Sequence, residues 1–252
     1  LSKHGKTQFF HMEHAIRTEV NTDGLYPLAK MYWKDTPPSE NIRNYKQFQS
    51  LYEGTLLTHF EYGKNKVEVI SWFDPVNPDV AGITIDVTGK PSDIIFEPFS
   101  VYDINYQPEV PQSVEIKKTT DSYNIILSCF DTKSEVYLKT NATVKLKGTK
   151  LILSLQPGKN KILLSVNNPI KISSNKSLEQ TKTWWENQWN NTGLIVLPDS
   201  VVQNMWVRSM YQFLSTYNDD TLGLTPPCGF TGNNWVFNFP QDVSYIHPVL
   251  LA

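Results

Sequence analysis

The chain has 252 residues, of which 40% are hydrophobic and 19% charged, a composition typical of folded globular proteins and unlike that of disordered ones. Its 23 Lys and Arg nearly balance its 25 Asp and Glu, so the formal net charge of −2 gives no indication of a nucleic-acid partner or an anionic membrane surface. No apolar run is long enough to span a bilayer. The length fits one large domain, or one complete domain with part of another.

Residues 1–50 open with a polar, weakly patterned segment. His11, Glu13 and His14 are residue types that bind metals, but a fourth ligand and a recognised spacing are missing. We therefore interpret Phe9-Phe10-His11-Met12-Glu13-His14 as a surface segment and predict no metal and no cofactor. The segment Asp35-Thr-Pro-Pro-Ser39 is expected to be a loop.

From Leu51 the pattern changes to an alternation of apolar and polar residues. Residues 54–62 and 67–73 predict a β-hairpin, with a turn over 63–65 and an exit loop over Asp74-Pro-Val-Asn-Pro78. Short strands of this kind, separated by Gly, Asn, Asp and Pro, predict a large antiparallel β-sandwich. The further strands are expected at 82–88, 93–98, 113–118, 123–129, 135–140, 143–146, 151–155 and 160–166.

Three residues near the hairpin are of types found in functional sites, namely His59, Trp72 and Asp74. We interpret them as core or hairpin residues, and we assign no catalytic role to the sandwich.

A polar joint over Ser173-Ser-Asn-Lys-Ser177 precedes a helical pattern. Ser177 is the expected N-cap, with Gln180 in the capping-box position. The pattern then repeats at steps of three and four residues. The two interpretations of its tryptophans are a sugar platform and a helix face packed against a neighbouring domain, and the second is favoured. The residues of this face are Leu178, Thr181, Trp184, Trp185, Gln188 and Trp189.

A short extended segment, Gly193–Asp199, leads to a second helix over 201–217, which starts at Asp199 or Ser200. Arg208 lies on this helix and receives no functional role. The expected apolar face consists of Val202, Met205, Trp206, Met210, Phe213 and Leu214.

The last stretch, Pro226 to Ala252, begins as a turn-rich loop and continues into an apolar helix. Aromatic faces can cover the C–H side of a pyranose, while amides and carboxylates bond to its hydroxyls. The candidate substrate-binding residues are Asn234, Trp235, Gln241 and Asp242. The alternative is an ordinary buried loop in which Asp242 caps the helix that follows.

This stretch resembles the entry of the catalytic domain in the six-hairpin, (α/α)6-barrel glycosidases. The most similar patterns are those of glycoside hydrolase family 65, the maltose phosphorylase and trehalase-like group, and of the α-fucosidase-like enzymes. The resemblance lies in Gly229-Phe-Thr-Gly232, Phe239-Pro-Gln-Asp242 and Tyr245-Ile-His-Pro-Val-Leu-Leu251. Pro240 stands where the family has Trp, and either Gln241 or Asp242 corresponds to the family's Asp.

Two segments of the predicted sandwich, Leu51-Tyr-Glu-Gly-Thr-Leu56 and Ile70-Ser-Trp-Phe-Asp-Pro75, resemble the N-terminal supersandwich of the same group. The resemblance implies a β-supersandwich over 1–172, a linker helix region over 173–198, and the first part of an (α/α)6 barrel over 199–252. It implies a glycoside hydrolase that acts on oligosaccharides by an inverting acid/base mechanism. In the resembling families the acid and base lie later in the barrel, so we assign no catalytic residue in this chain.

The ends of the sequence, Leu1 without an initiator Met and Ala252 inside an apparent helix, lead us to expect a fragment of a longer protein. The alternatives are a non-catalytic carbohydrate-binding β-sandwich module or a structural sandwich domain without a ligand. The expected partner is an oligosaccharide. A homodimer is an open alternative to a monomer. The substrate class suggests a periplasmic or secreted location. Two distant cysteines, Cys129 and Cys228, do not indicate a disulfide.

Overall fold

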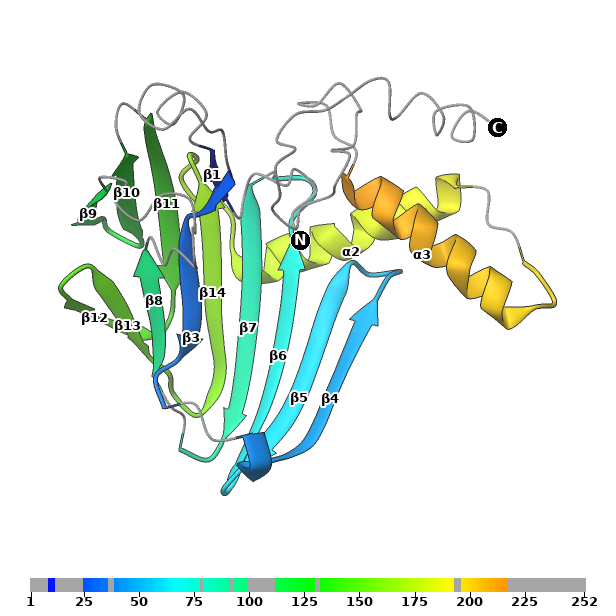
Figure 1. Cartoon of the computed structure of the whole chain (residues 1–252), viewed down its shortest axis with the longest axis horizontal. Helices are drawn as coiled ribbons and strands as arrows, with labels where there is room; N and C mark the ends of the chain where they lie inside the picture. Colours follow the sequence, from blue (N-terminus) through cyan, green and yellow to red (C-terminus); the bar gives the residue numbers. More distant parts are fainter. Residues whose placement is uncertain are drawn as a thin grey trace.

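A computed structural model describes residues 9–11, 25–35, 39–77, 79–90, 93–98, 112–129, 132–192 and 196–216. In these ranges the chain is mostly β-sheet, followed by two α-helices. Figure 1 shows the strands as one broad sheet with a smaller sheet beside it, and the helices at one end of the broad sheet.

All neighbouring strands in the described sheets pair antiparallel, as the alternating pattern predicts. The larger sheet has eight strands in the order β4-β5-β6-β7-β14-β11-β10-β9, and the smaller has four in the order β12-β13-β8-β3. A separate pair joins β1 (Phe9–His11) and β2 (Leu25–Pro27). The bounds of the remaining strands are β3 (Ala29–Trp33), β4 (Ile42–Ser50), β5 (Thr55–Tyr62), β6 (Asn65–Phe73), β7 (Val80–Thr88), β8 (Ile94–Pro98), β9 (Gln112–Lys118), β10 (Tyr123–Cys129), β11 (Thr132–Thr140), β12 (Thr143–Lys147), β13 (Lys150–Ser154) and β14 (Gly158–Val166).

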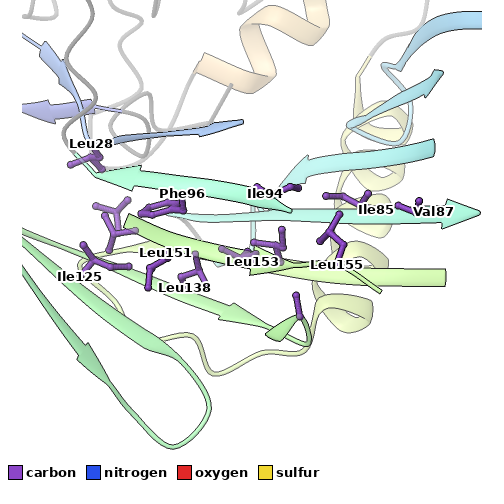
Figure 2. Close-up of a cluster of buried hydrophobic side chains, with 14 of the residues drawn as sticks. Leu28, Ile85, Val87, Ile94, Phe96, Ile125, Leu138, Leu151, Leu153 and Leu155 are labelled. Carbon is purple, nitrogen blue, oxygen red and sulfur yellow. The ribbon is translucent and has the colours of Figure 1, made fainter. Parts of the chain in front are cut away.

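The main core lies between the two larger sheets, where inward-facing residues of both interdigitate. Figure 2 shows Phe96, Leu151 and Leu153 from the four-stranded sheet packed against Ile125 and Leu138 from the eight-stranded one. Their almost complete burial explains why these strands alternate so regularly: each second residue must be apolar to fill the space between the sheets. The structure therefore agrees with the predicted β-sandwich.

No strand was predicted before residue 54, yet the described part of residues 1–50 has four strands: β1, β2, β3 and β4. Residues 29–33 form β3 and residues 42–50 form β4, each at the edge of its sheet. Strand β4 has exposed residues along nearly its whole length, so neither face imposes an apolar alternation. The segment from Leu51 to Gly54 is the turn between β4 and β5 rather than a strand.

Helix α2 spans Ser174–Asn191 and crosses the end of the eight-stranded sheet near β6, β7 and β14 (Figure 1). Its N-cap is Ser173, not Ser177 as predicted, because Ser173 has an extended backbone and accepts a hydrogen bond from the Lys176 backbone N–H. The helix therefore begins one turn earlier than the capping box indicated, and Ser177 lies inside it with its side chain fully buried.

Helix α3 spans Ser200–Thr216, within one residue of the predicted bounds. Its predicted apolar face is partly wrong. Val202 and Met205 are exposed, whereas Val207 is buried against α2 and Tyr211 packs beside it. The inward face is thus rotated toward Val207 and Tyr211, because the partner of α3 in the described structure is the tryptophan row of α2.

Candidate functional site at the junction of sheet and helices

The four predicted substrate-binding residues, Asn234, Trp235, Gln241 and Asp242, lie outside the described residues. The same holds for Glu13, His14 and Cys228. Their roles stay predictions from the sequence. The described chemistry of interest is concentrated where α2 and α3 meet the β4–β6 end of the large sheet.

A buried carboxylate joins the sandwich to α2. Asp74, directly after β6, is only 2% exposed. Its Oδ2 accepts hydrogen bonds from the Ser177 hydroxyl (2.8 Å) and the Gln180 amide (2.6 Å). On the sheet side its Oδ1 accepts the backbone N–H groups of Val76 and Asn77, both at 2.9 Å. The Asn77 amide also donates to Oδ2.

Ser177 links this carboxylate to the sheet a second time. Its hydroxyl donates to Asp74 and accepts from the indole N–H of Trp72 at 3.0 Å. Trp72 lies flat against Gly82 on the neighbouring strand, where an added Cβ would stand 2.1 Å from the indole ring. The interpretation of Trp72 and Asp74 as core residues is confirmed. Because uncharged donors bond both Asp74 oxygens, this carboxylate stabilises the junction between the sheet and α2.

Small polar residues allow α2 to approach the sheet closely. Ser174, Ser177 and Thr181 form the buried stripe of its first half, and the Thr181 hydroxyl donates to the Ser177 carbonyl. The stripe continues at four-residue spacing with Trp185 and Trp189.

The tryptophan row packs the second half of α2 against α3 and the β4–β5 turn. The Trp185 ring stacks on Tyr211 with centroids 4.6 Å apart and planes at 19°. Trp189 donates its indole N–H to the Leu51 carbonyl at 3.0 Å. Trp185 and Trp189 are buried, which confirms the favoured interpretation of a packed helix face for these two residues, whereas Trp184 is only partly buried.

Gly54 is required in the β4–β5 turn for two reasons. Its φ of +63° lies in the left-handed region, and an added Cβ would stand 1.9 Å from the Trp185 indole nitrogen. Trp185 is therefore held between the turn backbone on one side and Tyr211 on the other.

A cavity of about 300 Å³ lies beside this aromatic pair, between α2, α3 and strands β4 to β6. Trp184, Trp185 and Tyr211 form its aromatic wall, and Gln47 and Gln49 of the edge strand lie on the sheet side. The remaining lining residues are Gly54, Thr55, Leu56, Ser71, Trp72, Phe73, Pro75, Leu214 and Ser215. The sequence pointed to the tryptophans but not to Gln47 and Gln49, because nothing local marks an exposed edge strand as part of a cavity.

A second cavity, of about 430 Å³, lies within the sandwich and is mainly apolar. Leu28, Met31, Phe96, Val136 and Leu164 are among its lining residues. Aliphatic walls of this kind offer few groups to orient a polar substrate.

The shifted titratable groups have local causes. A hydrogen bond from Lys150 holds the pKa of Glu97 below its ordinary value. The hydrogen bond from Tyr137 likewise lowers the pKa of Glu135, and together with burial it raises the pKa of Tyr137 to about 12. Burial also raises the pKa of Tyr211, an effect that its hydrogen bond with Gln49 opposes. Each carboxylate is stabilised in its charged form, which is unlike a glycosidase general acid, whose pKa is raised.

Within the described ranges no three His, Cys, Asp or Glu side chains are grouped to hold a metal ion. His59 is half-exposed beside Glu61 on β5, in keeping with a hairpin role. No helix of the described part is both long and apolar enough to cross a membrane.

The fold has counterparts among solved structures. A human-microbiome protein assigned as a kojibiose phosphorylase matches 83% of this chain with a TM-score of 0.58 at 13% sequence identity. The glycosyl hydrolase CcMan5 of family GH92 matches 64% of the chain with a TM-score of 0.47 at 10% identity. The chain spans 35% of the first protein and 27% of the second. No family model matches the sequence, and no curated protein matches it significantly. At such identities the first likeness shows the fold alone.

Proposed function

We propose that this chain is the N-terminal part of a carbohydrate-active enzyme, a glycoside hydrolase or phosphorylase that acts on oligosaccharides. The observation that carries the proposal is the shared fold over 83% of the chain with a protein assigned as a kojibiose phosphorylase. The resemblance of residues 229–251 to the barrel entry of family 65 adds support.

In this proposal the sandwich has a structural role and residues 199–252 begin an (α/α)6 barrel. Inverting hydrolysis needs one carboxylic acid to protonate the leaving oxygen and one carboxylate to activate water, about 6.5–9.5 Å apart. Both groups are expected in the part of the enzyme that follows residue 252. A phosphorolytic enzyme would use phosphate in place of the base and its water. A homodimer and a periplasmic or secreted location stay predictions from the sequence.

Asp242 is the carboxylate that we propose to bind a substrate hydroxyl, with Gln241, Trp235 and Asn234 beside it. The variant Asp242→Ala in the full-length enzyme should lower kcat/KM by about 10- to 100-fold, the loss expected for a charge-assisted hydrogen bond of ~1.5–3 kcal/mol. The melting temperature should change little. Measured loss of folding, with unchanged kcat/KM in the folded fraction, would instead assign Asp242 to a helix cap.

A further inference from the structure

The cavity between the helices and the β4–β6 end of the sheet has walls suited to a particular kind of ligand. One wall is aromatic: Trp184 stands edge-on to Trp185, at 5.1 Å and 85°, and Trp185 stacks on Tyr211. The other groups are the amides of Gln47 and Gln49 and the hydroxyls of Thr55, Ser71 and Ser215. Flat apolar rings facing a set of uncharged donors and acceptors suit a ring that is apolar on its faces and rich in hydroxyls at its edge.

The charge of the lining residues further restricts the kind of ligand that suits this cavity. No Asp, Glu, Lys, Arg or His is among the described residues that line this cavity. The described lining therefore holds no cation to balance a phosphate or a sugar acid, and desolvating an unpaired charge is unfavourable. A neutral ligand meets no such penalty.

The aromatic wall is held in place before any ligand binds. Gly54 on one side and Tyr211 on the other fix the Trp185 ring, and the Tyr211 hydroxyl bonds to the side chain of Gln49. On the sheet side, the Gln47 amide donates to the Thr58 hydroxyl at 3.1 Å. A wall that needs no rearrangement loses less entropy on binding.

The cavity is accessible from solvent at the edge of the sheet. Gln47 and Gln49 are exposed residues of β4, which is the last strand of the eight-stranded sheet. An amide also has more donors and acceptors than the single hydrogen bonds described for these two side chains. They are therefore the groups that an entering hydroxyl-rich ligand would meet first.

We propose that this cavity is a binding site for a neutral saccharide, with one sugar ring against Trp184 and Tyr211 and its hydroxyls on Gln47 and Gln49. The volume of about 300 Å³ lies at the lower end of the range for small-molecule sites, which favours a single sugar unit. This site concerns binding and not turnover, so it does not depend on the proposed enzymatic function.

The test is to titrate the full chain with glucose, maltose and kojibiose, and with glucuronate as the charged comparison. Binding is measured by tryptophan fluorescence and by calorimetry. At least one neutral sugar should bind and change the fluorescence, and glucuronate should bind more weakly. The variant Gln49→Met keeps the side-chain length but removes the amide, and should weaken binding about 3- to 10-fold, the effect of one uncharged hydrogen bond. Trp184→Leu should weaken it as well.

Gln188→Met is the matched control, because Gln188 lies on α2 outside the cavity lining and its replacement should leave binding unchanged. Melting temperatures separate loss of binding from loss of folding. The proposal is overturned if none of the neutral sugars binds, or if binding is equal in Gln49→Met, Trp184→Leu and Gln188→Met. Binding that is unchanged in Asp242→Ala but weakened in Gln49→Met assigns the sugar to this cavity, whatever the turnover assays show.

Discussion

Asp74 is a carboxylate buried at the boundary between two parts of the molecule, and its described hydrogen-bond donors are all uncharged. A group of this kind stabilises the fold only while every donor remains paired, since an unpaired buried polar group costs more than a hydrogen bond contributes. The same bonds couple Trp72 of the sheet to Ser177 of α2. Asp74 therefore helps to hold α2 against the sheet.

Asp74→Asn should destabilise the chain by about 2–3 kcal/mol, because an amide nitrogen would replace one carboxylate oxygen and face donors. Urea unfolding measures this change. Asp121→Asn is the control: Asp121 is an exposed partner of Lys139, and its replacement should leave the unfolding midpoint nearly unchanged. Equal effects of the two variants would contradict the structural role of Asp74.

Glu97 allows a prediction about pH. Lys150 lowers its pKa below the ordinary value of 4.5, so its stabilising contribution is present above that value and is lost as the pH falls through the folded-state pKa. Glu97→Gln should therefore lower Tm by about 1–3 °C at neutral pH, a small effect because the ion pair is partly exposed. The difference in Tm between the unmodified protein and Glu97→Gln should vanish in acid. A difference that persists or grows in acid would exclude this origin.

At the scale of elements, the alternation of apolar residues predicted most strands within two residues, because both inner faces of a sandwich must be apolar. It failed for β4, whose exposure on both faces removes the signal, and for β3, whose residues are all half-buried and give no alternation. Strands β1 and β2 were not predicted either. The helix positions were predictable from the spacing of their apolar residues, but the face of α3 that points inward was not. That face is decided by Trp185 of α2, which no pattern within α3 can reveal.

Gly82 tests the packing of β6 on β7. Gly82→Ala would push a methyl group into the Trp72 indole, so we expect a loss of about 1–3 kcal/mol from overpacking, together with a change in Trp72 fluorescence. Gly148→Asn is the control, since open space surrounds Gly148 and Asn tolerates its left-handed φ of +59°. If Gly82→Ala were as stable as Gly148→Asn, the close contact between Gly82 and Trp72 would be contradicted.

For the whole molecule, the sequence indicated a sandwich followed by helices, and the structure agrees. The candidate cavity was not predictable, because it combines an edge strand near residue 48 with helices near residues 185 and 211, and only the folded chain brings them together. The predicted sugar contacts around Asp242 follow from resemblance, and their geometry lies outside the described residues. The proposal of a carbohydrate-active enzyme therefore depends on fold and motif together.

The most direct measurement is product analysis by NMR after incubating the whole native gene product with kojibiose, maltose and trehalose, with and without phosphate. The account predicts release of a free monosaccharide from at least one disaccharide. Dependence on phosphate, with a sugar 1-phosphate as second product, would identify a phosphorylase, and release in water alone a hydrolase. A folded, full-length protein that leaves all three disaccharides and a panel of aryl glycosides intact under both conditions would contradict the account.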